Sequence, residues 1–190
     1  MEVQFRRTGE RRYAITIYRK ELPPVEMNPA PGYDPLMSHD LLHLVVESAL
    51  GLRLGVFGQV AKGGHAGTFH PISSEGEDRR EAARHRRRAA KRGDKLLREG
   101  RLEAAQSERA TYICLYEWLV RSTDPVRRKR AVEMAAEARH IRELQPPAER
   151  GALNEARLVR ICARLDELSA RWTNLDIGES FTVEWPGLNA

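Results

Sequence analysis

The feature that most constrains the fold is a helical pattern over residues 74–176, which is more than half of the 190-residue chain. Apolar residues recur there at the spacing of amphipathic helices, and prolines and glycines divide the pattern. The segments predict helices over 77–99, 102–121, 125–144 and 154–172, with Ser73 and Ser74 as the cap of the first. Because such helices bury their apolar sides against one another, the pattern predicts a helical bundle. The helix at 102–121 is the most apolar and should lie at the centre, and Gly100 before it is typical of a helical hairpin.

Both ends of the chain have the alternating pattern of β-strands. Residues 2–7 and 12–18 flank a turn centred on Gly9 and predict a hairpin within residues 1–20. Apolar and polar residues also alternate over 180–185, in the C-terminal segment 177–190. Because an isolated hairpin is marginally stable, we expect this third strand to join it. The sequence therefore predicts a mostly α, α+β fold in a single domain spanning 1–190: a helical bundle with a small antiparallel sheet.

Between the hairpin and the bundle, the pattern of residues 21–73 changes twice. Five of the ten prolines lie within residues 22–35, a density that argues against a helix or a central strand and predicts a long loop. Asp34 followed by a proline is typical of a helix start, so we expect a helix over 36–50. The glycine-rich stretch 51–67 after it predicts turns and close backbone packing.

The expected helix over 36–50 carries a pattern with metal chemistry. A spacing of four places His39, His43 and Glu47 along one helix face. Two imidazoles one turn apart can hold a divalent ion, and a carboxylate can complete a third position while leaving room for water. Asp40, next to His39, could bind the ion directly or orient a ring. The sequence therefore predicts a divalent metal site, with zinc as the ion, made by His39 and His43 with Asp40 and Glu47 as third ligand or supporting residues.

The segment His39-Asp40-Leu41-Leu42-His43 resembles the His-Asp-x-x-His zinc motif of the helical ubiquinone-biosynthesis family, which is associated with modification of the quinone ring. In that family a glutamate follows the second histidine after eleven intervening residues, and the corresponding residue here is Gly55. The resemblance implies zinc and a role in a quinone pathway. Glu47 is the carboxylate that could substitute for the glutamate missing at position 55.

The net charge of +5 is distributed very unevenly along the chain. Residues 79–101 contain 11 Lys and Arg against 3 Asp and Glu, a net of +8, which leaves 21 positive and 24 negative residues elsewhere, a net of −3. A helix with this charge suits phosphate contacts, which we assign to Arg84, Arg87, Arg88, Lys91 and Lys95. Because no aromatic residue, Asn or Gln is interleaved with these cations, sequence-specific readout is not indicated. A solvated helix, or one that binds an acidic protein or a membrane surface, remains open as an alternative.

Other features narrow the possible functions. No signal peptide and no apolar run of membrane-spanning length is present, so we expect a cytoplasmic protein. Cys114 and Cys162 are interpreted as buried thiols, and His65 and His70 as loop residues rather than ligands. The glycines match neither a dinucleotide fingerprint nor a phosphate-binding loop, and no Gly-x-Ser-x-Gly motif occurs.

Two functions from different classes remain open. The first is a metal-binding protein, either hydrolase-like with metal-activated water or part of a quinone pathway. The second is a non-catalytic nucleic-acid-binding or scaffold protein that uses residues 79–101, with His39 and His43 as ordinary polar surface. A homo-oligomer is compatible with both.

Overall fold

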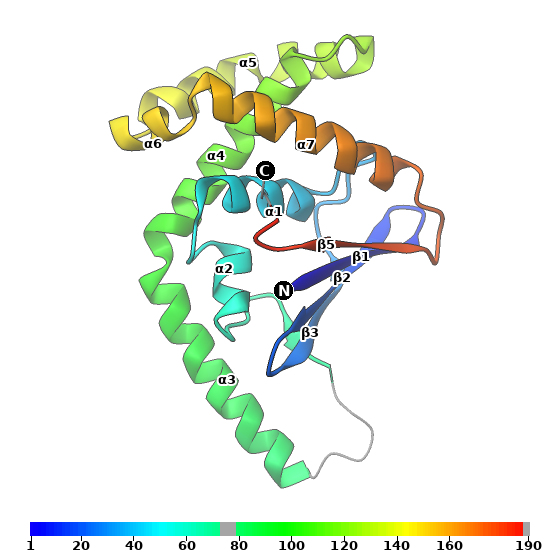
Figure 1. Cartoon of the computed structure of the whole chain (residues 1–190), viewed down its shortest axis with the longest axis vertical. Helices are drawn as coiled ribbons and strands as arrows, with labels where there is room; N and C mark the ends of the chain where they lie inside the picture. The colour runs from blue at the N-terminus through cyan, green and yellow to red at the C-terminus, as the bar shows by residue number, and fades with distance from the viewer. Residues whose placement is uncertain (73–78, 188–190) are drawn as a thin grey trace.

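The computed structural model describes residues 1–72 and 79–187 and shows a mostly helical α+β fold (Figure 1), as the sequence predicts. The strands are β1 (Glu2–Gly9), β2 (Arg12–Arg19), β3 (Leu22–Ala30), β4 (His70–Pro71) and β5 (Ser180–Glu184). The helices are α1 (His39–Leu50), α2 (Val56–Ala61), α3 (Arg79–Glu99), α4 (Arg101–Val120), α5 (Pro125–Leu144), α6 (Pro147–Ala152) and α7 (Glu155–Thr173). The predicted helix cap at Ser73 and Ser74 lies outside the described residues.

The two ends of the chain lie side by side in one antiparallel sheet with the strand order β4-β3-β2-β1-β5. The β1–β2 hairpin and its pairing with the C-terminal strand β5 are confirmed. Val3 faces Val183 and Phe5 faces Phe181 across the β1–β5 pair. The terminal amino group of Met1 also donates to the carbonyl oxygen of Trp185 at 2.8 Å. The first and last strands of the chain are therefore neighbours, with β5 at the edge of the sheet, and the helices lie between these strands in the sequence.

The prediction of a loop over residues 22–35 is wrong for its first part, which forms β3. Three prolines, at positions 23, 24 and 29, flank the residues of β3 that pair most regularly with β2, which are Val25, Glu26 and Met27. The register between β2 and β3 shifts on both sides of this stretch. The other edge of β3 pairs only with the two-residue strand β4 among the described residues. The prolines are thus tolerated because few ladder hydrogen bonds depend on their missing N–H groups.

The helix expected over 36–50 begins three residues later than predicted. Ser38 caps α1, and its hydroxyl accepts a hydrogen bond from the Leu41 amide at 3.4 Å. Asp34 instead closes a turn by accepting a hydrogen bond from the Leu36 amide at 2.8 Å. The helix ends at Gly51, whose φ of 67° lies in the left-handed region that glycine favours. The glycine-rich stretch after it contains the short helix α2, which the glycine content does not predict.

The predicted hairpin around Gly100 is also wrong. Figure 1 shows α4 continuing from α3 with a bend, while α3 extends away from the other helices. Gly100 has a φ of −85° and a ψ of 0°. Its amide donates to the Leu96 carbonyl and its carbonyl accepts from the Ala104 amide, both at 2.8 Å. These helical hydrogen bonds run across the junction, so the chain bends at Gly100 and does not reverse.

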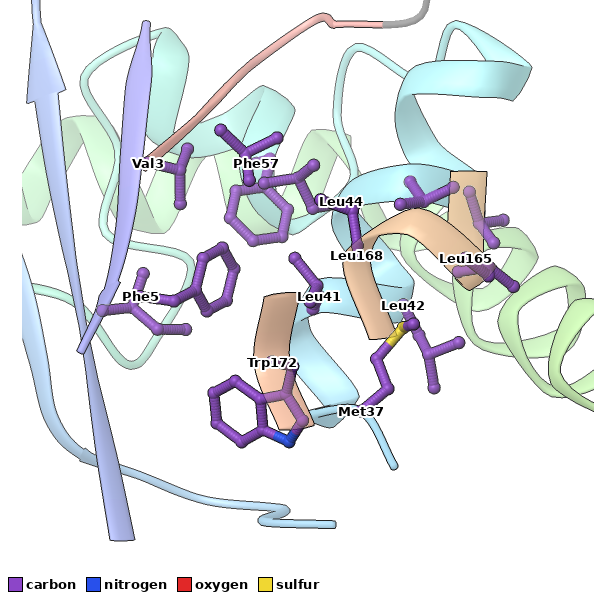
Figure 2. Packing of buried hydrophobic residues seen from close by; sticks show 14 of the residues in the cluster. Val3, Phe5, Met37, Leu41, Leu42, Leu44, Phe57, Leu165, Leu168 and Trp172 are labelled. Carbon is purple, nitrogen blue, oxygen red and sulfur yellow. The ribbon is translucent and has the colours of Figure 1, made fainter. Parts of the chain in front are cut away.

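One hydrophobic core joins the sheet to α1, α4 and α7 (Figure 2). Phe5 of β1, Leu41 of α1 and Trp172 of α7 meet in it, together with Phe57 of α2. Residues 41–47 of α1 are all buried, so this helix is surrounded on most sides. α4 packs against α1, α5 and α7, in agreement with its predicted central position.

Two further expectations concern single features of the chain. Cys114 and Cys162 are free and buried, as predicted. Burial raises the pKa of the Cys162 thiol to about 11. Within the described part of the chain, no helix combines the length and the apolar character needed to cross a membrane.

Candidate metal site

The first turn of α1 brings the two histidines of the sequence motif together. His39 is the first residue of the helix and His43 lies one turn later, so both rings lie on the same face. Their Nε2 atoms are 3.0 Å apart. The side chain of His39 is 53% exposed, whereas His43 is only 3% exposed. The pair therefore presents two nitrogen atoms from the edge of the core toward the surface.

A carboxylate from α4 completes this group. The Oε2 atom of Glu108 lies 3.6 Å from Nε2 of His43 and 4.0 Å from Nε2 of His39. The side chain of Glu108 is 65% exposed. His39, His43 and Glu108 thus each direct one ligand atom to a common point and form a group that could hold a metal ion.

The other ring nitrogen of His43 faces a buried polar chain. Nδ1 lies 2.8 Å from the Ser107 hydroxyl oxygen and 3.4 Å from that of Thr111. The Ser107 hydroxyl donates to Oε1 of Glu47 at 2.8 Å. Ser107, Thr111 and Glu47 are all buried. The ring of His43 is therefore held from behind by contacts that leave Nε2 facing His39 and Glu108.

Glu47 is placed behind His43 and outside the group of His39, His43 and Glu108. It is fully buried, and its carboxylate accepts hydrogen bonds from the amides of Val56 at 2.8 Å and Phe57 at 2.9 Å. Burial raises the pKa of Glu47, and the hydrogen bond from Ser107 offsets part of this effect. The carboxylate thus connects α1 to the start of α2 and to α4.

Gly55 is packed against this carboxylate. A Cβ atom at position 55 would lie 2.4 Å from the carboxylate carbon of Glu47, which is far inside van der Waals contact. Glu47 therefore occupies the space that any side chain at position 55 would need.

Replacing Gly55 by alanine is expected to lower the free energy of unfolding by about 1–3 kcal/mol, because a buried carboxylate with three hydrogen-bond donors cannot move aside freely. Urea denaturation measures this change. Gly151→Ala is the matched control, because a Cβ there meets nothing within 4 Å. Equal stability of the Gly55→Ala variant and the wild type would contradict the packing described.

Asp40, the other predicted carboxylate, is also placed outside the group. Its Oδ2 atom makes a hydrogen bond with the Tyr13 hydroxyl, which also contacts the carbonyl oxygen of Pro31. Burial raises the pKa of both Asp40 and Tyr13. Asp40 therefore ties the first turn of α1 to β2, close to His39 in the sequence and directed toward the sheet.

The surroundings set the charge of the three converging side chains. Burial lowers the pKa of His39, and the neighbouring His43 lowers it further. The hydrogen bond with His43 lowers the pKa of Glu108. Burial opposes a charge on His43, but the interactions with Glu108, Glu47 and Asp40 together outweigh it, so the pKa of His43 is raised. Metal binding requires both imidazoles to be uncharged and Glu108 to be ionised, so the pKa shifts of His39 and Glu108 favour it, whereas the raised pKa of His43 makes protons compete with the ion at that ring.

On its exposed side, His39 lines a pocket of about 250 Å³. The wall includes the side chains of Leu42, Leu115 and Trp118. An ion pair between Arg130 and Asp34, with a separation of 2.6 Å, adds the charged part of the lining. The group of His39, His43 and Glu108 thus lies beside a hollow of small-molecule size with mixed apolar and charged walls.

The remaining histidines of this region lie elsewhere. Nε2 of His65 is 3.9 Å from Asp94 of α3, and its Nδ1 accepts a hydrogen bond from the Gly67 amide at 2.9 Å. His70 is exposed in β4. Neither belongs to the group of His39, His43 and Glu108.

Sequence patterns did not identify Glu108 or Ser107. Both lie on α4, more than sixty residues after His43, so no local spacing links them to it. One signal was present: Ser107 and Thr111, four residues apart, are polar residues in the helix predicted to be most central. Buried polar side chains need partners, and two on one face of a central helix indicate a polar group opposite them.

Comparison of the chain with protein-family models, with curated proteins and with solved structures found no match in any of the three.

Proposed function

We propose that this protein binds one zinc ion through Nε2 of His39, Nε2 of His43 and a carboxylate oxygen of Glu108. The observation that supports this most directly is the convergence of these atoms, with separations of 3.0, 3.6 and 4.0 Å. Tetrahedral ligands at zinc bond lengths of about 2.0–2.1 Å lie about 3.3 Å from one another. One of the three separations is shorter than this value and two are longer, so a small movement of the exposed side chains of His39 and Glu108 is enough to bring the three atoms to tetrahedral positions around one ion.

The contacts behind His43 support the same proposal. Zinc binding at Nε2 requires the ring proton to be on Nδ1. The Ser107 oxygen can accept that proton at 2.8 Å while its own hydroxyl donates to Glu47. Carboxylates and hydroxyls in this position fix the tautomer and the orientation of metal-binding histidines. Ser107 and Glu47 are thus positioning residues in this proposal, and the ligands are His39, His43 and Glu108.

Two histidines and one glutamate leave a fourth position for water or a substrate, as in catalytic zinc sites. Bound zinc lowers the pKa of such a water to about 7 and so supplies a nucleophile for hydrolysis. The pocket beside His39 would hold the substrate on the exposed side. A hydrolase-like activity therefore accounts for the three-ligand set and the neighbouring pocket. The quinone pathway rests on the resemblance of residues 39–43 alone.

Metal analysis of the purified full-length chain tests the proposal. We expect about one equivalent of zinc per chain for the wild type and less than about a tenth for His39→Ala/His43→Ala, because one imidazole pair supplies two of the three ligands. His70→Ala/His140→Ala is the matched control, since both residues are exposed and lie outside the group. The control variant should retain its zinc.

Two results would overturn parts of the proposal. Wild-type protein that binds no zinc, even after incubation with the ion, would exclude a zinc site. Stoichiometric iron bound by the same residues would retain the ligand set, since two histidines and a carboxylate also hold non-haem iron, but it would replace the hydrolytic chemistry.

A further inference from the structure

The most strongly charged element of the molecule, α3, presents its cations along one face. Five of these cations follow the spacing i, i+3, i+4, i+7 and i+11. They are Arg84, Arg87, Arg88, Lys91 and Lys95. Residues with this spacing form a continuous stripe on a helix. All five are exposed. The stripe extends for about 16 Å along the helix axis, at a rise of 1.5 Å per residue.

The opposite face of α3 is what holds the helix to the rest of the protein. Gly93 and Leu96 are buried there. Gly93 packs so closely on the His65 ring that a Cβ would lie 2.0 Å from it, and Leu96 contacts the segment at Gly64. Figure 1 shows the N-terminal end of α3 far from the bundle. The charged stripe is therefore presented by a helix that is anchored near its C-terminal end.

Among the described side chains, two acidic residues of α3 lie near the stripe. Residues 79–101 contain three acidic residues, Glu81, Asp94 and Glu99, and the side chain of Glu81 lies outside the described part of the structure. Asp94 lies 3.9 Å from His65, on the anchored side of the helix. Glu99 lies 3.6 Å from Lys95, but both side chains are at least half exposed, and exposed pairs of this kind contribute little.

We infer that α3 binds duplex DNA through its phosphate backbone, without sequence specificity. A stripe of about 16 Å faces about ten phosphate charges of a DNA duplex, which carries one charge per 1.7 Å of its axis. The B-form major groove, about 12 Å wide, admits a single helix, whereas the deep and narrow major groove of duplex RNA does not.

The residue types in the stripe favour DNA duplex over the other anionic partners. Single strands are bound by stacking on aromatic side chains, and residues 79–101 contain none. Membrane surfaces are bound by helices with large apolar residues opposite the cations. In α3 the apolar residues near the N-terminal end are alanines, and the large Leu96 is buried against the protein.

Fluorescence anisotropy with a labelled DNA duplex of about 24 base pairs and arbitrary sequence, at about 50 and 200 mM NaCl, tests this inference with the full-length chain. For five phosphate contacts the affinity should fall about 500-fold between these salt concentrations. Neutralising the stripe by Arg84→Gln/Arg87→Gln/Arg88→Gln/Lys91→Gln/Lys95→Gln should lower the affinity at the lower salt concentration about 100-fold and remove most of the salt dependence.

Two further variants test whether a loss of DNA binding comes from the stripe itself, from the lower net charge of the protein or from misfolding. The first neutralises five exposed cations on α5, α6 and α7, which are Arg128, Lys129, Arg139, Arg150 and Arg160. It carries the same net charge as the stripe variant and should bind within about threefold of the wild type if the contacts are local. The second, Arg84→Lys/Arg87→Lys/Arg88→Lys, keeps the charge and should also bind within about threefold, because lysine serves as a phosphate-binding point charge.

Several outcomes would overturn the inference. Absence of wild-type binding at the lower salt concentration excludes a DNA-binding helix. Equal losses in the stripe variant and in the variant of α5, α6 and α7 assign binding to net charge alone. Tighter binding to a single strand of the same length, to duplex RNA or to phosphatidylserine vesicles, with the same dependence on the stripe, assigns α3 to that partner instead.

Discussion

Replacing Glu47 by alanine is expected to lower the free energy of unfolding by about 3–5 kcal/mol, the largest stability effect that we predict. The carboxylate accepts hydrogen bonds from the Val56 amide, the Phe57 amide and the Ser107 hydroxyl. Each donor left unsatisfied in the core costs about 1–3 kcal/mol. Removing a buried carboxylate, whose own desolvation opposes folding, offsets part of this sum.

Urea denaturation in the presence of a chelator measures this loss independently of any bound metal. Glu47→Gln should be destabilised less than Glu47→Ala, because the side-chain oxygen of the glutamine still accepts a hydrogen bond. Some destabilisation should remain, because the side-chain nitrogen of the glutamine would face a hydrogen-bond donor instead of accepting from it. Glu108→Ala is the matched control: Glu108 is 65% exposed, and its loss should change the unfolding free energy by no more than about 0.5 kcal/mol. Similar stability of the Glu47 and Glu108 variants would contradict the role assigned to Glu47.

Replacing Ser107 by alanine is expected to weaken zinc binding about 10- to 100-fold, the loss typical when a residue that orients a metal-binding histidine is removed. Without the Ser107 hydroxyl, Nδ1 of His43 has the Thr111 hydroxyl at 3.4 Å and the Glu47 carboxylate farther away, at 3.9 Å. The ring would then lose its preferred tautomer and orientation, although all three ligands would remain. Competition with a chelator of known affinity measures the Kd, and circular dichroism checks that the variant is folded.

Thr111→Val is the control for this prediction, because it removes the more distant hydroxyl from the same buried environment. It should change the zinc Kd by less than about threefold, since a contact of 3.4 Å is weaker than one of 2.8 Å. Ser107→Thr, which retains a hydroxyl, should bind more tightly than Ser107→Ala. Equal effects of Ser107→Ala and Thr111→Val would show that packing, rather than the hydrogen bond to His43, determines the affinity.

Local periodicity predicted much of the fold, and pairing between distant segments explains where it did not. The alternation of β1, β2 and β5 and the apolar stripes of α4, α5 and α7 were sufficient to predict those elements. The density of prolines over 22–35 argues against a strand, but the structure places the prolines of β3 outside its regularly paired residues 25–27. That tolerance depends on where β2 pairs with β3 and on a two-residue partner strand, neither of which composition reveals.

Only the part of the candidate site that lies on a single helix can be predicted from the sequence. The spacing of His39 and His43 is a property of one helix and can be derived from the sequence. The third member of the group, Glu108, depends on how α4 packs against α1, and an exposed glutamate within a long helix has no distinguishing pattern. Glu47 was recognised on the correct face of α1, but its burial beneath Gly55 turns its carboxylate toward the amides of α2.

The burial of residues 41–47 in α1 has a consequence for studies of mutational tolerance. Substitutions throughout that stretch should reduce the amount of folded protein, so a scan scored by abundance would not separate the proposed ligand His43 from its apolar neighbours. His39 and Glu108 differ, because both are largely exposed and contribute little to the core. Variants at these two positions should therefore stay folded while losing the proposed zinc ion, so a comparison of abundance with zinc content tests whether His39 and Glu108 are functional residues.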